Sequence, residues 1–204
     1  MPNRQSLWAK EAAHLGSIIR YADDVVILCR TEADAQRAHR WLQGTAQALK
    51  LSLHPDKTRI VDLREGADGF DFLGFHLRLV KSHRYRKWYC QRWPAGRAMA
   101  SIRAKVKAIT APRSRLKWPI GELVAELNPV LRGWGNYFRW GNSARKFSQV
   151  DEYVRERLAL FDSQKRQKRG RRWGVVHTNA WTTGLGIHRL SGTVRYFPSA
   201  TART

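Results

Sequence analysis

Two adjacent carboxylates, Asp23 and Asp24, lie in the stretch "RYADDVVILC" between short apolar runs. Side by side they repel each other, so both stay ionised at a cost unless a cation lies between them. The β-branched residues of "SIIRY" and "VVILC" predict the two strands of a β-hairpin with the carboxylates at its tip. A solvated turn without function is the alternative interpretation, and the flanking sequence favours a tip that binds a cation.

The composition indicates an extended polyanion as the partner. Lys and Arg number 38 against 16 Asp and Glu, which gives a net charge of +22, and the 204 residues are 43% hydrophobic, enough for one domain or two small ones. No apolar run has the length of a membrane-spanning helix, and residues 1–17 lack the apolar middle of a signal peptide. We therefore expect a cytoplasmic protein without a membrane partner, in which Cys29 and Cys90 are reduced thiols.

The first part of the chain predicts a sheet with a helix on one face. Thr31 can cap a helix with acids in its first turn, and the apolar residues of this helix recur on one face: Ala35, Ala38, Leu42, Ala46 and Leu49. After it, alternating leucines lead into a turn and a strand over residues 57–63, and "GFDFLGFHLRL" predicts one further strand. The order hairpin, helix, strand, strand is typical of an α+β fold.

From about Arg97 the sequence becomes helical and basic. The stretch "AMASIRAKVKAIT" has an apolar stripe on one side, and Pro112 is expected to end this helix. A second helix is expected from Pro119 and a third from near Ser148, ending in a basic run before residue 170. We expect an N-terminal stub over 1–17, an α+β part over 18–93, an all-α bundle over 97–170 and a basic, Trp- and Gly-rich tail over 171–204 whose periodicity is too weak to assign.

Several motifs, in this order, resemble those of group II intron-encoded reverse transcriptases. "YADD" at residues 21–24 resembles the catalytic hairpin, "HPDKTRIV" and "FDFLGFHL" resemble the strand segments that follow it, and "LNPVLRGWGNYFRWG" resembles the maturase, or thumb, domain. The resemblance covers residues 18–161 and continues more weakly into "LSGTVRYF". It implies a partial reverse-transcriptase palm of hairpin, helix and antiparallel strands, followed by an all-α thumb bundle, in a bacterial protein associated with RNA or the nucleoid.

The resemblance also implies the chemistry of the hairpin. Asp23 and Asp24 would be the catalytic, Mg²⁺-binding carboxylates, with Tyr21 and Ala22 completing the active-site hairpin; two Mg²⁺ ions stabilise the attacking and leaving oxygens of nucleotide transfer. The family's remaining metal-binding Asp lies on a strand well upstream, whereas the only acid before this hairpin is Glu11, without a strand pattern around it. We therefore expect no polymerase activity from this chain alone, and Mg²⁺ binding only when a missing N-terminal polymerase half is supplied.

Further residues are candidates for contact with nucleic acid. Phe72, Leu73 and Gly74 fall at the family's primer grip, although as core strand residues they would need no function. The stretch "HRYRKWYCQRW" interleaves basic and aromatic residues. This mixture suits phosphate contact and base stacking. It fits equally well a strand with one solvent-exposed face and aromatic core residues on the other face. The candidate basic contacts are Lys57, Arg84, Arg86, Lys87, Arg113, Arg115, Lys117, Arg132, Arg139, Lys165, Arg166, Lys168, Arg169, Arg171 and Arg172.

Neighbouring aromatic residues are expected to have a different role. Trp134, Tyr137 and Phe138 fit one helical face, which favours the core of the bundle over a stacking platform. Arg113, Arg115 and Lys117 also fit a plain basic loop between two helices.

Three hypotheses follow. In the first, the chain is the C-terminal portion of a reverse transcriptase/maturase that binds structured intron RNA, with a DNA primer or target as a further partner once the polymerase is complete. In the second, it is a stand-alone RNA-binding splicing factor whose hairpin is a relic. In the third, it is a non-functional product whose sheet exposes an apolar edge.

Overall fold

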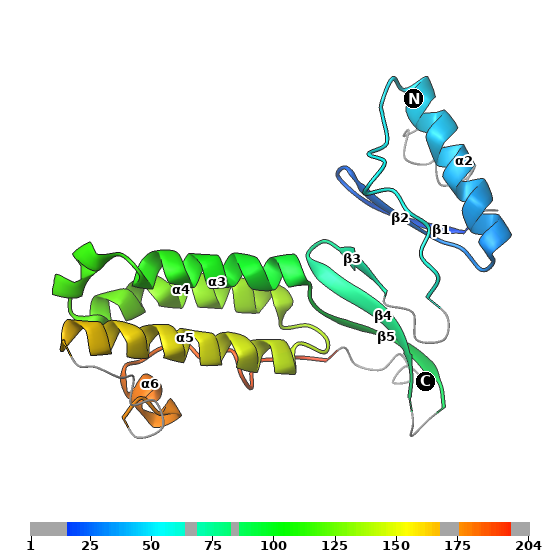
Figure 1. Ribbon diagram of the computed structural model, residues 1–204. Helices are drawn as coiled ribbons and strands as arrows, with labels where there is room; N and C mark the ends of the chain where they lie inside the picture. Colours follow the sequence, from blue (N-terminus) through cyan, green and yellow to red (C-terminus); the bar gives the residue numbers. More distant parts are fainter. Residues whose placement is uncertain (1–15, 64–68, 83–85, 168–175, 197–204) are drawn as a thin grey trace, which may run out of the picture. The chain divides into compact units, whose positions relative to one another are not determined.

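The computed structural model describes residues 16–63, 69–82, 86–167 and 176–196 (Figure 1). The chain divides into two compact units, the N-terminal unit of Met1–Leu73 with Arg78–Trp88 and the C-terminal unit of Gly74–Leu77 with Tyr89–Thr204. Helices occur together with small antiparallel sheets, which confirms the predicted α+β class. No helix in the described ranges is both long and apolar enough to cross a membrane.

The predicted acidic hairpin is present in the N-terminal unit. Strand β1 (Ser17–Tyr21) pairs antiparallel with β2 (Asp24–Leu28), with Tyr21 opposite Asp24. These strands form a two-stranded sheet, and β2 contacts the helix that follows it. The β-branched runs of the sequence therefore form the strands that they predict.

Helix α2 (Glu32–Ala48) begins at the predicted cap. Thr31 has an extended backbone, and its hydroxyl accepts a hydrogen bond from the Asp34 amide at 3.1 Å and donates one to the Asp34 carboxylate at 2.7 Å. Ala38 and Ala46 are buried on its inner face, as the spacing predicts. Leu49, which the same spacing placed on this face, lies beyond the last helical residue and is 47% exposed.

Loss of this cap tests the start of α2. Replacing Thr31 with Ala is expected to destabilise the helix by about 1 kcal/mol, because the Asp34 amide loses its acceptor. Amide hydrogen exchange in α2 should then be about fivefold faster. Thr31→Ser keeps the hydroxyl and should exchange like the wild type; equal rates in both variants would contradict the capping role.

The end of α2 explains why the leucines that follow this helix do not form a strand. Lys50 has a positive φ of 55°, its amide donates to the Gln47 carbonyl at 3.0 Å, and the Leu51 amide donates to the Ala46 carbonyl at 2.8 Å. These two hydrogen bonds define a Schellman motif. Leu51 thus belongs to the helix end and is 63% exposed, so the leucine alternation was not that of a strand.

The strand predicted over residues 57–63 is wrong. Residues 58–63 form no strand in the structure, and Ile60 is 49% exposed. A strand needs a neighbour for its backbone hydrogen bonds, and the sheet of β1 and β2 contains only these two strands within the described ranges.

The second aromatic segment forms two strands where one was predicted. Strands β3 (Phe70–Phe72), β4 (Phe75–Lys81) and β5 (Trp88–Pro94) lie in that order in a three-stranded sheet. Leu73 and Gly74 between β3 and β4 have positive φ of 49° and 77°, as the two central residues of a type I′ turn require. The chain reverses at this turn, although Leu73 carries no signal for it.

Three long helices pack against one another in the C-terminal unit (Figure 1). They are α3 (Gly96–Thr110), α4 (Ile120–Phe138) and α5 (Ala144–Lys165), and the 3-10 helix η1 (Arg113–Lys117) joins the first two. Helix α3 ends before Pro112 and α4 begins after Pro119, as predicted. The predicted all-α bundle is therefore present.

The bundle closes around one apolar core. The predicted stripe of α3 is buried in it, and the main buried side chains of the cluster are Met99, Ile102, Val106, Val124, Leu127, Leu131, Phe138, Phe147, Val150, Val154, Leu158 and Leu190. Side chains from all three helices and from the C-terminal segment therefore share one interior.

Helix α5 starts four residues before the predicted position. Ser143 precedes it, but the buried Ser143 hydroxyl donates to the Phe138 carbonyl at 2.7 Å and makes no cap hydrogen bond to α5. Phe147, in the first turn, is fully buried. The prediction was wrong because it relied on the acids after Ser148, whereas burial of Phe147 fixes the start.

The tail that the sequence left unassigned packs on the bundle in its described part. It contains helix α6 (Asn179–Gly184). The Asn128 side chain on α4 donates to the Gly186 carbonyl at 3.0 Å and accepts from the His188 amide at 2.7 Å. The Asp151 carboxylate on α5 accepts from the amides of residues 190 and 191 at 2.9 and 2.8 Å. Two polar side chains, one from each helix, thus fasten the segment.

Candidate functional site

The two carboxylates occupy the tip of the β1–β2 hairpin. Asp23 lies in the two-residue turn and Asp24 is the first residue of β2; both are exposed. Tyr21 on the facing strand is 65% exposed, so the whole predicted active-site tetrad 21–24 is accessible.

The turn itself is conformationally strained. Ala22 has a positive φ of 49°, a region that costs an L-residue about 1–2 kcal/mol. Its carbonyl accepts a hydrogen bond from Nε of Arg20 at 2.9 Å, which helps to hold the turn. A two-residue hairpin turn requires a positive φ at one or both of its central residues, so this strain follows from the turn, and the catalytic role of Asp23 and Asp24 stays a prediction.

The proposed primer-grip residues lie at the turn between β3 and β4. Phe72 is half-buried at the end of β3, and Leu73 and Gly74 form the turn itself. A side chain at position 74 would lie in ordinary van der Waals contact with the Phe138 ring, at 3.4 Å, so the positive φ and not crowding favours glycine here. The assignment of a primer grip to these residues stays a prediction.

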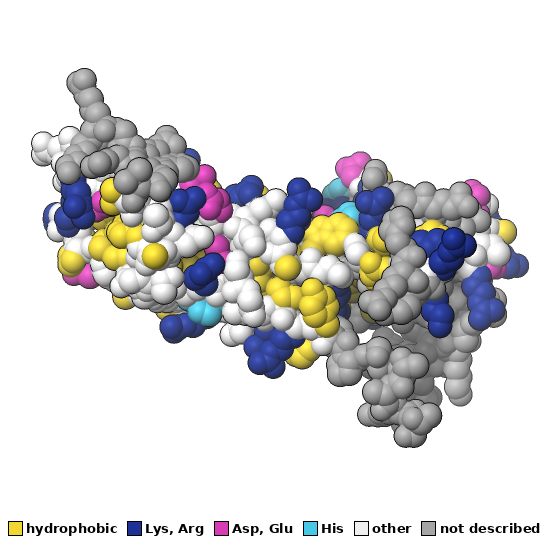
Figure 2. Space-filling model, turned by 90° about the horizontal axis from the view of Figure 1, so that it is seen from below, with side chains coloured by type: hydrophobic (Ala, Val, Ile, Leu, Met, Phe, Trp, Pro, Cys, Tyr) yellow, Lys and Arg dark blue, Asp and Glu magenta, His cyan; other side chains and the backbone are white. Residues whose placement is uncertain are grey.

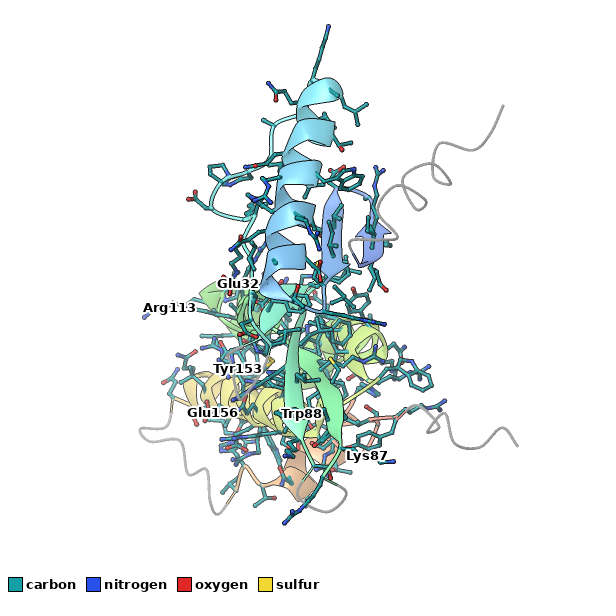
Figure 3. All side chains as sticks on the ribbon, turned by 90° about the vertical axis from the view of Figure 1, so that its right-hand side faces the viewer. Glu32, Lys87, Trp88, Arg113, Tyr153 and Glu156 are labelled. Atoms are coloured by element: carbon teal, nitrogen blue, oxygen red, sulfur yellow. The ribbon has the colours of Figure 1, made fainter. Side chains whose placement is uncertain are left out.

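Candidate basic contacts of the N-terminal unit are exposed. Lys57 lies in the turn after His54, and Arg86 and Lys87 precede β5. Lys87 and Trp88 are neighbours at the start of this strand (Figure 3), and the Lys81 ammonium lies 5.8 Å from the centre of the Trp88 ring. From Trp88 onward the interleaved segment forms β5, and the described residues at and just before its start present basic and aromatic side chains to solvent. Arg84 and Glu11 lie outside the described residues.

In the C-terminal unit, η1 carries basic side chains of two kinds. Arg113 and Lys117 are exposed (Arg113 is labelled in Figure 3). Arg115 is half-buried, pairs with Glu126 and stacks at 4.9 Å on the Trp118 ring. Arg115 therefore already has structural partners, whereas the other two project from the surface.

The remaining candidates divide in the same way. Arg132 on α4 is exposed, whereas Arg139 is half-buried. Lys165 donates to the Trp118 carbonyl, and Arg166 pairs with the Asp162 carboxylate at 2.8 Å. Lys168, Arg169, Arg171 and Arg172 lie outside the described residues. On the face shown in Figure 2, Lys and Arg side chains are spread along the described surface with fewer Asp and Glu between them.

The aromatic residues of α4 are core residues with one exception. Phe138 is buried and Trp134 packs against the core cluster, as predicted. Tyr137 is 53% exposed, so the prediction was wrong for this residue. Residues 134 and 138 are one helical turn apart, whereas Tyr137 lies at the edge of their face, with its ring centre 5.5 Å from that of Phe75.

Comparison with protein families agrees with the order of the motifs. Residues 6–77 match the model for reverse transcriptase (RNA-dependent DNA polymerase), and residues 99–178 match the group II intron, maturase-specific domain. No match is found among the curated proteins. A polymerase segment followed by a maturase domain defines the class of intron-encoded reverse transcriptases. The chain belongs to the group II intron reverse transcriptase/maturase family, and its maturase domain implies binding of intron RNA.

The reverse transcriptase family generally uses Mg²⁺. Asp23 and Asp24 offer the hard oxygen ligands that this ion prefers. Across the described part of the chain, however, no three His, Cys, Asp or Glu residues are grouped so that they could hold a metal ion. The described residues therefore do not fit a complete metal site, and no catalytic step through a metal follows from them.

Proposed function

We propose that this chain binds structured intron RNA through the basic surface of its C-terminal unit and so assists splicing, and that it synthesises no DNA by itself. The observation that carries the proposal is a contrast within the bundle. Its interior is closed by apolar side chains, whereas Arg113, Lys117 and Arg132 are exposed and form no ion pair with any described carboxylate. No described carboxylate neutralises these three cations, and phosphates of an RNA would do so.

The proposed lack of DNA synthesis is supported by the small number of metal ligands at the hairpin. Two-metal catalysis needs metal ligands on more than one element. Among the described residues, no third His, Cys, Asp or Glu is grouped with Asp23 and Asp24 as a ligand. We propose that DNA synthesis requires an N-terminal polymerase half with a further metal-binding Asp. A DNA primer or target then becomes a partner as well.

The second candidate function is a stand-alone splicing factor in which the hairpin is a relic. It is favoured by the C-terminal unit having a closed core of its own. Both candidates bind intron RNA, and they differ in whether an added N-terminal half restores primer extension with Mg²⁺.

Removal of the three exposed cations tests the RNA-binding surface. The triple variant R113Q/K117Q/R132Q is expected to reduce the slope of log affinity against log salt by about 3, one unit for each lost phosphate contact. Binding of a folded group II intron transcript would be measured between about 50 and 200 mM salt. The variant D23N/D24N removes charge from the hairpin alone and should bind without loss; an unchanged slope in the triple variant would contradict the proposed surface.

A further inference from the structure

A cavity of about 350 Å³ lies in the C-terminal unit between the end of α4 and the segment 188–195. Side chains of both elements line it, among them Asn136, Arg139, His188 and Arg195, with Gly135 and Gly192 between them. The hairpin chemistry does not involve this cavity, and the residues proposed above as the RNA-binding surface do not line it.

Hydrogen bonds and close packing hold the walls of this cavity in place. The Arg195 amide donates to the Arg139 carbonyl at 2.7 Å, and the Arg195 carbonyl accepts from the Gly141 amide at 2.9 Å. A side chain at Gly135 would lie 2.5 Å from a methyl carbon of Leu190, so the segment can approach α4 this closely only at a glycine. The cavity is therefore formed before any ligand arrives.

The lining of the cavity has an unbalanced positive charge. Two guanidinium groups and no carboxylate line it. Nη1 of Arg139 donates to the side-chain oxygen of Asn136 at 3.4 Å, whereas the buried Nε of the same group has no hydrogen-bond partner among the described residues. The carboxylate of Asp151, on α5, already accepts from two backbone amides. An anion in the cavity would balance the charge of the two guanidinium groups.

The volume of the cavity and its other polar groups indicate which class of anion it can bind. A volume of about 350 Å³ is at the lower end of the range for small-molecule sites, about 300–1,000 Å³. Burial and the nearby Arg132 lower the pKa of His188, so its ring is neutral near pH 7 and can both donate and accept. Together with the Asn136 amide it can hydrogen-bond the edge of a base, and only an unpaired base has that edge free.

We propose that this cavity binds one unpaired RNA nucleotide through its phosphate and its base. Arg139 and Arg195 neutralise the phosphate, and Asn136 and His188 contact the base. The inference rests on the proposed function in that the nucleotide belongs to the bound RNA. A nucleotide within a duplex is excluded, because its base is stacked and paired.

Short single-stranded RNAs and the same sequences as duplexes would be compared by fluorescence anisotropy. Asn136→Trp fills the cavity from an exposed position of α4 without changing charge, and Arg139→Gln removes one cation. Arg145→Gln is the matched control, because Arg145 is exposed on α5 and does not line the cavity. Both cavity variants should bind single strands at least about tenfold more weakly, and the control at most about threefold more weakly.

A measurement on the wild type keeps the test valid if a variant fails to fold. Mononucleotides such as 5′-UMP or 5′-AMP should displace a single-stranded RNA, whereas inorganic phosphate at equal ionic strength should not. Equal losses in the cavity variants and Arg145→Gln, or no difference between mononucleotide and phosphate, would overturn the proposed cavity site. If instead single strands bind through the cavity but the folded intron transcript does not bind, the proposed function fails and the cavity site stands.

Discussion

A Leu127→Ala variant is expected to lose about 3 to 4 kcal/mol of unfolding free energy in the C-terminal unit. Leu127 lies on α4, is fully buried and belongs to the cluster that all three long helices share. The substitution removes apolar contacts and leaves a cavity. The surrounding helices cannot move in to close it, because each of them packs against the other two. A loss of this size is a large fraction of the stability of an ordinary domain.

Urea unfolding followed by circular dichroism measures this loss. Leu51→Ala is the matched control, because the same atoms are removed from a side chain that is 63% exposed. The control should change the unfolding free energy by less than about 0.5 kcal/mol. Similar midpoints for the two variants would mean that the bundle does not close around Leu127.

Elements whose signals are local could be predicted from the sequence. The β-branched runs around the acidic turn, the Thr31 cap and the apolar stripe of α3 each act within one element, and the structure contains all three. The position of the candidate catalytic carboxylates followed from the same local pattern, because a short hairpin fixes which residues form its tip.

The predictions were wrong or missing where the contact that decides the structure has no signal in the residue types, whether this contact is local or distant. The leucines after α2 alternate as in a strand, but a Schellman motif uses Leu51. Leu73 has a positive φ. A glycine at this position would have indicated such a backbone conformation in the sequence, but a leucine does not. Asn128 on α4 and Asp151 on α5 hydrogen-bond to the tail. Their partners lie at least 58 and 39 residues away in the sequence, respectively. The type of a polar residue does not indicate so distant a partner.

The cavity could not be predicted for the same reason. Asn136 and Arg195 meet because backbone hydrogen bonds join the end of α4 to the C-terminal segment. Gly135 is compatible with a close approach of the C-terminal segment to α4. A glycine in a sequence does not by itself indicate such an approach, because glycines occur for many reasons. Sequence motifs located the polymerase hairpin and the maturase helices, but not the surfaces that these helices form with the tail.

Replacing Asp162 with Ala is expected to destabilise the C-terminal unit by about 2 to 3 kcal/mol near neutral pH. Asp162 on α5 is buried, and its carboxylate lies 3.0 Å from Nε2 of the buried His177 and 2.8 Å from Nε of Arg166. Arg155 donates to the His177 carbonyl at 2.8 Å, so the histidine also joins the C-terminal segment to α5. Loss of the carboxylate removes the acceptor that the buried ring uses.

The effect of Asp162→Ala should depend on pH in one direction. Burial alone would raise the pKa of Asp162, but the hydrogen bonds from His177 and Arg166 outweigh it and lower the pKa. A carboxyl with a lowered pKa stabilises the fold above its unfolded pKa of about 3.9 and loses this effect as the pH falls through the folded value. The part of the difference in unfolding free energy that comes from the ionised carboxylate should therefore shrink as the pH falls below about pH 4.

Arg166→Gln separates the two partners of this carboxylate. The Arg166 side chain is 60% exposed, so its ion pair is screened by solvent and its loss should cost less than about 1 kcal/mol. Unfolding of the three proteins would be followed by circular dichroism at several pH values. The buried contact with His177 has no water to replace it when the carboxylate is removed, whereas the exposed pair with Arg166 has. Equal losses of unfolding free energy for Arg166→Gln and Asp162→Ala would therefore mean that the exposed pair, and not the contact with His177, accounts for the stabilisation by Asp162.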